Sequence, residues 1–498
     1  MRKVGPKLLL LLISLLFTYI LFIRFYRAVD FFSFNFDEEY QAWLAWMQVV
    51  DFHFIWIGVG ASGLKYYLGP GFVYLNALLF KLSGGDPVIL AYFSPLVGVA
   101  TLVSIFFVVK TFLGKRAGVF AAIMYGGSAY INYFDRRFWN PLPIPILTVW
   151  LVFSLLKAKT NPKWMILAIG LMALSYHVHL SLWIFWPILA WQLLSIRKNL
   201  KPVTIVAMVM VFLGITSPLL VFDFVHNFDN ILAPFKFILN IGGLSHTPLY
   251  MLFWQHLQSL WNVLGKVWVL NWYSNLQEEQ YLGAHVNLAT IASPILNLLS
   301  LLILLSVFYK YLNKPLVRLI ALAMGIYFVA YVFYPGEVLE HFLLGFIGLE
   351  AVVIGIFVSR LPTGLGVLIT FLFLFVNTGT VLTSNQAKYG LTARRNLINK
   401  TMQALDNSNF DLKIVGNDPR IYSPYGGWRY LFQSYGKLPT TSEADESFGW
   451  IYGIKPAPSK PTYGVVIAED RRLSTKFTPK VQFQDGAFSA YIFPSGSL

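Results

Sequence analysis

Three consecutive acidic residues, Asp37, Glu38 and Glu39, follow the first long apolar segment of the chain. Adjacent carboxylates repel each other, so at least one of them has a raised pKa unless a cation neutralises it. Such a carboxylate is suited to take a proton from an attacking hydroxyl or amine. Asp37 and Glu38 are therefore our candidate catalytic residues, and they are also the candidate ligands of a divalent cation, should one be used. The alternative is that Asp37 caps the following helix and that the glutamates favour its dipole.

A second group of residues is basic. Arg136 and Arg137 lie side by side in a short polar turn, followed by Phe-Trp-Asn-Pro. Guanidinium groups match phosphate oxygens well, so a lipid phosphate is the natural partner of this pair; the alternative is an interfacial anchor that touches ordinary headgroups. Arg24, at the end of the first apolar segment, has the same two interpretations, and Lys65 offers a single cation beside two tyrosines.

Two histidines, His177 and His179, are separated by one residue and lie between two short apolar segments. They could bind a phosphate or a metal, or they could be solvated turn residues. Other polar residues near the ends of apolar segments are predicted to line the same cavity: Glu340, His341, Asp223 and His226.

The composition determines the class of protein. Of 498 residues, 57% are hydrophobic and only 12% are charged, whereas about a quarter of the residues of a soluble domain carry charge. The pattern fits a polytopic membrane protein. The absence of cysteine excludes disulfides, thiol catalysis, zinc–thiolate sites and iron–sulfur clusters. The net charge of +15 does not indicate nucleic-acid binding, because the basic residues lie between apolar segments.

Apolar stretches of near-spanning length predict about eleven transmembrane helices. They cover residues 8–27, 88–112, 117–134, 141–157, 163–176, 181–196, 202–223, 287–309, 315–334, 338–358 and 362–383. The stretch 163–196 is interpreted as two short helices that meet at a polar apex. One set of connecting loops contains basic residues and no acidic residue, and the alternate set contains most of the acids. The positive-inside rule therefore predicts a multi-pass plasma-membrane protein with a cytoplasmic N-terminus.

Three portions are predicted to leave the membrane on the outer side. Two are loops of the membrane domain 1–383: residues 28–87, which contain an amphipathic helix after the acidic cluster, and residues 224–286, which are rich in tryptophan. The third, 384–498, has ordinary charge density and is predicted to be a small extracytoplasmic α/β domain. Its expected elements are helices at 387–405 and 428–435 and strands at 410–415, 463–468, 481–483 and 489–493.

The order of these motifs resembles the C-type (GT-C) integral-membrane glycosyltransferases, in particular the prokaryotic relatives of the protein mannosyltransferases and aminoarabinose transferases. The resemblance covers residues 1–383. It rests on the Asp37-Glu38 pair, Lys-Tyr-Tyr-x-Gly-Pro from Lys65, Arg-Arg-Phe-Trp-Asn-Pro from Arg136, His-x-His from His177, and Ser217-Pro218 followed by Phe222-Asp223 and His226-Asn227-Phe228.

The resemblance implies transfer of a sugar from a polyprenyl-phosphate donor to an acceptor lipid, glycan or protein at the outer face. It implies that Asp37 is the general base or positions the acceptor, and that Arg136, Arg137, Arg24 and Lys65, with His177 and His179, bind the donor phosphate. A Pro-Pro pair that is usual after the first-loop lysine is replaced here by two tyrosines. Some relatives use a divalent cation and others do not. One alternative function is a transporter or flippase, although neither paired internal symmetry nor a nucleotide-binding motif is found. Another is a non-catalytic membrane scaffold whose C-terminal tail binds partners.

Overall fold

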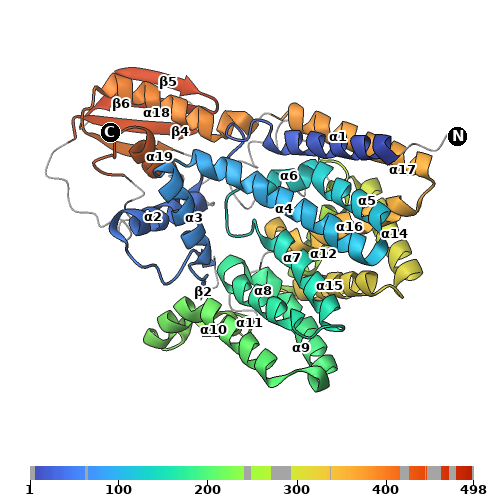
Figure 1. The fold of residues 1–498 in the computed structure, drawn as a ribbon. Coiled ribbons are helices and arrows are strands. Elements are labelled where there is room, and N and C mark those ends of the chain that lie inside the picture. The colour runs from blue at the N-terminus through green and yellow to red at the C-terminus, as the bar shows by residue number, and fades with distance from the viewer. Residues whose placement is uncertain are drawn as a thin grey trace.

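The structure, a computed structural model of the chain, describes residues 6–61, 66–239, 248–270, 293–336, 338–384, 386–415, 426–442, 445, 461–469 and 478–495. Within these residues helices dominate, and strands occur in one short hairpin and in one sheet near the C-terminus. Figure 1 shows a bundle of long helices with the sheet beside one end of it. The predicted class, an α-helical membrane protein with a small C-terminal α/β portion, is confirmed.

The predicted apolar segments all contain helices. The helices of the bundle are α1 (Pro6–Phe25), α4 (Val88–Leu113), α5 (Lys115–Gly127), α6 (Ala129–Asp135), α7 (Ile144–Ala158), α8 (Trp164–Val178), α9 (Phe185–Ile196), α10 (Pro202–Val225), α14 (Pro294–Tyr311), α15 (Pro315–Val332), α16 (Leu344–Arg360) and α17 (Thr363–Leu382). Among the described residues, 7 helical stretches are long and apolar enough to cross a membrane, and shorter apolar helices accompany them. The chain is therefore a multi-pass membrane protein, and the number of its spans stays a prediction.

Helix α16 lies at the centre of the bundle. Nearly all of its residues are buried, and it packs against α5, α7, α14 and α15. The contact with α5 is close because a Cβ at Gly355 would lie only 2.3 Å from the Cα of Ala121. Small residues at such a crossing bring two backbones together, which is how helices gain packing energy in a membrane.

Two breaks in the helices form polar turns toward the end of the bundle near the sheet, and the side chains of Ser128, Arg136, Arg137 and His177 in these turns are buried. Ser128 separates α5 from α6, and its hydroxyl donates to the carbonyl of Val267 at 2.9 Å. The turn after α6 carries the two adjacent arginines. Helix α8 ends at Val178, and the short 3-10 helix η1 (Leu180–Ile184) begins after His179, which confirms the predicted apex between two short helices.

The first outer loop contains more helix than the sequence predicts. The amphipathic helix is present as α2 (Phe36–Asp51), and a hairpin of β1 (Gly60–Ala61) and β2 (Tyr66–Tyr67) follows. Helix α3 (Gly71–Ser83) was not predicted, because a largely apolar stretch of 13 residues is too short to span a bilayer. It packs along α2 instead. The other outer helices are α11 (Asp229–Leu239) and α12 (Leu249–Lys266), and the 3-10 helix η4 (Glu340–Leu343) leads into α16.

The C-terminal portion has the predicted order of elements. It consists of α18 (Leu391–Leu405), β3 (Phe410–Val415), α19 (Trp428–Tyr435), β4 (Tyr463–Glu469), β5 (Val481–Asp485) and β6 (Phe488–Pro494). The sheet order is β3-β4-β6-β5, in which β3 and β4 are parallel and the other pairs are antiparallel. Figure 1 shows this portion beside α2, α3 and the C-terminal end of α1.

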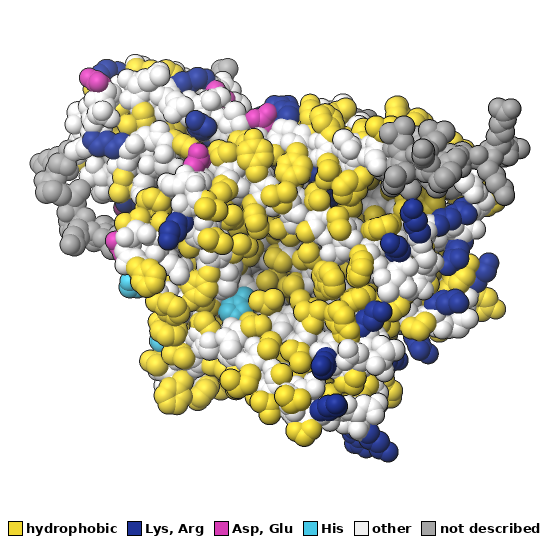
Figure 2. All heavy atoms as spheres, in the orientation of Figure 1, with side chains coloured by type: hydrophobic (Ala, Val, Ile, Leu, Met, Phe, Trp, Pro, Cys, Tyr) yellow, Lys and Arg dark blue, Asp and Glu magenta, His cyan; other side chains and the backbone are white. Residues whose placement is uncertain are grey.

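The visible face of the molecule is divided by residue type. Figure 2 shows basic side chains gathered at the end of the bundle away from the sheet, a broad hydrophobic zone in the middle, and both acidic and basic side chains toward the sheet. Within the hydrophobic zone the face is hollowed, with a histidine side chain at the hollow.

Candidate active site

The acidic cluster forms the first turn of α2. Asn35 is the N-cap, and its backbone N–H donates to Oε2 of Glu38 at 3.1 Å. This reciprocal contact is half of a capping box, and it explains why the helix begins at Phe36. Acidic residues at this end also oppose the positive end of the helix dipole. The capping role considered for the acids is thus taken by Asn35 and Glu38.

The three adjacent carboxylates have three different surroundings. Glu38 is 1% exposed, and its Oε1 accepts from Nη2 of Arg137 at 2.9 Å. Glu39 is fully buried and accepts two backbone N–H groups of the C-terminal portion, from Gly427 and Tyr430. Asp37 is partly exposed and has no hydrogen bond or ion pair within the residues described. It is therefore the carboxylate of the cluster that remains available to a ligand.

Charge and burial set the protonation of this cluster. Burial, together with the neighbouring Glu38 charge and against the opposing effect of Arg137, raises the pKa of Asp37 to about 6. Burial alone would lower the pKa of Arg137, but Glu38, Tyr133 and Asp37 outweigh it and the pKa rises. The side chain of Arg137 also covers the ring of Trp139, 4.0 Å from its centroid. Asp37 thus lies within the electrostatic reach of a guanidinium that stays charged.

Arg136 points toward the end of α1. Its Nη2 donates to the carbonyls of Ile23 at 2.8 Å and Tyr26 at 3.2 Å, and its guanidinium lies 4.7 Å from the ring centroid of Phe31. Carbonyls in the last turn of a helix lack partners within the helix, so a buried arginine is a suitable donor to them. Burial, with a smaller effect of Arg24, lowers the pKa of Arg136 to about 9. Arg136 stays charged at neutral pH.

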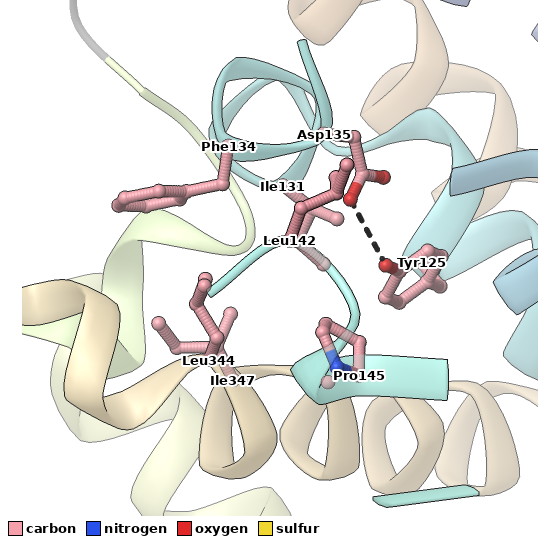
Figure 3. Close-up of a pocket in the computed structure, with 9 residues that line it drawn as sticks. Tyr125, Ile131, Phe134, Asp135, Leu142, Pro145, Leu344 and Ile347 are labelled. Atoms are coloured by element: carbon pink, nitrogen blue, oxygen red, sulfur yellow. Dashed lines mark hydrogen bonds between the residues drawn. The ribbon is translucent and has the colours of Figure 1, made fainter. Parts of the chain in front are cut away.

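Arg24 is fully buried in a cluster with its neighbours from α5 and α6. It forms an ion pair with Asp135, which also accepts from the Tyr125 hydroxyl at 3.3 Å. Figure 3 shows Asp135 and Tyr125 on the wall of a small cavity, about 10 Å³, whose other lining residues are apolar. This is near the smallest volume that holds a water, so the cavity does not accommodate a sugar or a phosphate.

His177 joins three of the sequence motifs. Its Nδ1 accepts the backbone N–H of Gly71 at 3.0 Å, and its Nε2 lies 2.8 Å from the carbonyl of Ile215. These partners fix a neutral ring that carries its proton on Nε2. The backbone carbonyl of His177 accepts from Nδ2 of Asn140 at 3.1 Å. A Cβ at Gly69 would lie 2.2 Å from Nδ1, so glycine is required for this approach.

His179 and His341 belong to a row of rings. The His341 ring centroid lies 4.8 Å from that of Trp139 and 5.5 Å from that of His179, and Phe342 lies 5.1 Å from His179. Nδ1 of His179 accepts the backbone N–H of Ser181 at 3.1 Å. Burial lowers the pKa of His179 to about 4, so it is neutral at physiological pH. The row connects η1 and η4 to the ring under Arg137.

Glu340 has partners that the sequence analysis did not identify. It forms a buried ion pair with Lys266 at the end of α12, and its Oε2 accepts from the Tyr130 hydroxyl at 2.8 Å. The available signal was a lysine in an outer loop, which runs against the charge bias of such loops. Packing of the folded chain brings Lys266 and Glu340 together, and no local sequence pattern indicates that they pair.

The remaining predicted site residues lie elsewhere or outside the described part of the chain. Asp223 is buried and its Oδ1 accepts the backbone N–H of Ile231 at 3.1 Å, near the start of α11. His226 is exposed and stacks on Phe222 with 4.0 Å between ring centroids. No contact among the described residues brings either of them to Asp37. Lys65 lies outside the described residues.

The Asp37–Glu38 pair was the candidate metal site. In the part of the chain that the structure describes, no group of three or more histidine, aspartate or glutamate side chains is arranged to hold a metal ion. Both oxygens of Glu38 are engaged, by Asn35 and by Arg137. The pair as arranged does not fit a chelated cation, and we derive no step through a metal.

Comparison with known proteins agrees with the motif order. Residues 68–222 match the family described as Dolichyl-phosphate-mannose-protein mannosyltransferase. The structure is similar to ArnT from Cupriavidus metallidurans bound to undecaprenyl phosphate, with a TM-score of 0.62 and 12% identity over 97% of this chain and 98% of that chain.

The apo state of the same ArnT gives a TM-score of 0.58 and 12% identity over 96% of this chain and 97% of that chain. A comparison with the curated proteins finds no match. The fold and the family match together support a C-type integral-membrane glycosyltransferase of the branch that contains ArnT and the protein mannosyltransferases, as the motif order predicts.

Proposed function

We propose that this chain transfers a sugar from a polyprenyl-phosphate donor to an acceptor at the outer face of the membrane. The observation that carries the proposal is the first turn of α2, where the carboxylate of Asp37, unpaired among the described residues, lies next to Glu38 and its partner Arg137. The solved relative of similar fold, ArnT, holds undecaprenyl phosphate, which supports a lipid phosphate as the donor's leaving group.

The proposed reaction is a direct displacement at the anomeric carbon. Asp37 takes the proton of the acceptor hydroxyl or amine, whose oxygen or nitrogen forms the new bond to that carbon. The bond between the carbon and the phosphate oxygen breaks, and the lipid phosphate leaves with the electron pair. Arg137 stabilises the charge on the leaving phosphate, since Glu38 engages its Nη2 while its Nε has no hydrogen-bond partner within the described residues.

The other predicted phosphate ligands contribute less directly than Arg137 in this proposal. Arg136 adds positive potential next to Arg137 while one of its nitrogens holds the end of α1. The charge of Arg24 is compensated by Asp135, and both ring nitrogens of His177 are engaged, so we propose supporting roles for these two. His179 is proposed to line the cavity with His341, and Lys65 stays a candidate on the resemblance alone.

The orientation in the membrane is part of the proposal. Basic side chains gather at the end of the bundle opposite the sheet (Figure 2), and the acidic cluster contacts the C-terminal portion through Glu39. The positive-inside rule then gives a cytoplasmic N-terminus and an extracytoplasmic domain 384–498. Asp223, His226 and Glu340 would be on the same outer side as Asp37.

The test is a transfer assay with the purified full chain in lipid nanodiscs. Labelled polyprenyl-phosphate sugars of several kinds are incubated with the protein and extracted membrane acceptors. We expect the label to move to an acceptor with release of an equal amount of free lipid phosphate. In a parallel assay with the protein in sealed vesicles, movement of intact donor across the bilayer without release of lipid phosphate would instead identify a flippase and refute the proposal.

A further inference from the structure

Glu39 connects the first turn of α2 with the C-terminal portion. Its Oε2 accepts the backbone N–H of Gly427 at 2.6 Å, and its Oε1 accepts that of Tyr430 at 2.8 Å. Gly427 is the N-cap of α19, and Tyr430 lies in the first turn of that helix. A carboxylate at a helix N-terminus makes charge-assisted hydrogen bonds and also interacts favourably with the helix dipole. Glu39 therefore caps α19 across a separation of 388 residues in the sequence.

Arg394 of α18 forms a second link to the same turn. Its Nη1 donates to the carbonyl of Gly426 at 2.8 Å, and its Nη2 donates to Oδ1 of Asn35 at 3.2 Å. Asn35 is the N-cap of α2. Arg394 is 2% exposed, and its guanidinium lies 4.8 Å from the ring centroids of Trp428 and Phe488. Arg394 therefore holds the turn before α19 and the start of α2 together.

The face of α19 is fixed against the outer loop in the same way. The Tyr430 hydroxyl donates to the carbonyl of Gly85 at 2.9 Å, and the Tyr435 hydroxyl donates to Oδ1 of Asp86 at 2.6 Å. A Cβ at Gly427 would lie 2.1 Å from the carbonyl oxygen of Phe34. There is no room for a side chain between this turn and the loop before α2.

A carboxylate is a costly choice for a residue that only packs. Burial raises the pKa of Glu39 to about 7, and the hydrogen bonds from Tyr430 and Gly427 offset only part of this effect. An apolar side chain would fill the same space without the cost of a buried charge. The carboxylate adds a defined geometry, because its two short hydrogen bonds fix the position and orientation of α19 relative to one turn of α2.

We infer that Glu39 is a positioning residue, through which the C-terminal domain holds the carboxylate of Asp37 in place. Asp37 is two residues before Glu39 in the same turn, and the intervening Glu38 is tied to Arg137 on the membrane side. The turn is thus held from two sides, and loss of either contact lets the base move relative to Arg137. The inference rests on the proposed transferase function. Small displacements of a catalytic group cost about 10- to 100-fold in rate.

The experiment compares Glu39→Gln with a matched control in the full chain in nanodiscs. The amide oxygen of glutamine accepts one of the two N–H groups, while its NH₂ opposes the other. We expect kcat to fall about 10- to 100-fold with the KM for the lipid donor changed by less than about threefold. Amide hydrogen exchange should become faster over residues 35–40 and 427–432. The control, Asp485→Asn, breaks the Lys400–Asp485 ion pair within the same domain without touching α2, and it should leave all three readouts unchanged.

Tyr435→Phe is a second variant, needed if Glu39→Gln does not fold. It removes the hydrogen bond to Asp86 and leaves α2 untouched, so a smaller fall in kcat with the same exchange pattern is expected. Wild-type kcat in Glu39→Gln, or unchanged exchange over 35–40 in both variants, would overturn the inference. If the wild type transfers no sugar, the proposed function fails; faster exchange in Glu39→Gln would then still support the mechanical link between α19 and α2.

Discussion

Arg137 and Glu38 form a buried ion pair, with 2.9 Å between Nη2 and Oε1, that ties the turn after α6 to the first turn of α2. The pair brings a residue of the membrane bundle next to the first outer loop, and it places a cation near the adjacent Asp37. Two motifs that are about a hundred residues apart in the chain thereby become one site.

Asp37→Asn should abolish transfer while donor binding persists. The amide keeps the size of the side chain but takes no proton from the acceptor. We expect kcat to fall by about 100-fold or more, with donor affinity within about threefold of the wild type. Asp51→Asn, at the exposed end of the same helix, is the control and should be fully active. Near-normal turnover in Asp37→Asn would remove Asp37 as the base.

The same variant should be more stable than the wild type at neutral pH. The pKa of Asp37 is raised to about 6 in the folded protein, so the folded state binds this proton more tightly than the unfolded chain does. The resulting stability is present at low pH and is lost as the pH rises through about 6. An uncharged side chain avoids a loss of about 1–3 kcal/mol. A higher Tm with lost activity is expected; a Tm that falls at pH 8 would contradict this account.

The pH dependence of transfer should show a limb at about 6, the pKa of Asp37. The base acts in its deprotonated form, so kcat/KM should rise with pH and be about tenfold lower one unit below the pKa. Glu38→Gln removes the neighbouring negative charge that raises this pKa, so its limb should move to lower pH. If the limb of Glu38→Gln moves to higher pH, or if the kcat/KM of the wild type is flat between pH about 5 and 7, Asp37 is not the group whose titration sets the limb.

Arg137→Lys and Glu38→Gln should have opposite effects on donor affinity. Lysine keeps the charge but not the planar fork that matches phosphate oxygens, so the Kd for a polyprenyl-phosphate sugar should rise about tenfold or more. Glu38→Gln frees the guanidinium from its carboxylate and should leave the Kd unchanged or lower it. Binding is measured by titration with non-transferable donor lipid. If the Kd rises in both variants, the Arg137–Glu38 ion pair stabilises the fold and Arg137 does not bind the donor phosphate.

The Arg24–Asp135 pair should matter for stability rather than for donor binding. Removing one partner of a buried ion pair costs about 3–5 kcal/mol, because the other charge is left uncompensated. We therefore expect Arg24→Met to lower the Tm strongly and the double variant Arg24→Met with Asp135→Leu to recover most of it. Donor affinity per folded molecule should match the wild type in both variants. If the stable double variant loses affinity for the lipid donor, Arg24 binds the donor phosphate and the prediction is wrong.

The sequence predicted the helices and the C-terminal elements well because each of them has a local signal. Apolar length marks the membrane helices, and alternation marks strands such as β3 (Phe410–Val415) at the predicted bounds. Helix α3 was missed because its apolar stretch is short. Its stability comes from packing against α2, which no local pattern encodes.

For the candidate site, the sequence indicated residue types but not their partners, and the roles of these residues stay predictions. The pairing of acid and guanidinium was expected, and Arg137 lies at Glu38. That Arg136 binds the end of α1, and that Glu39 binds α19, depends on contacts between segments far apart in sequence. Hydropathy and charge patterns contain no information about such contacts.

The contact between Glu39 and α19 has a consequence for biosynthesis. A ribosome releases residues 35–39 long before residues 427–430 exist, so the nascent chain inserts its helices while the turn that carries Asp37 still lacks one of its supports. Completion of this turn would then be a late step of folding, possible only once residues 427–430 have been made. Under the proposed function, incomplete chains would be unable to consume lipid-linked sugar.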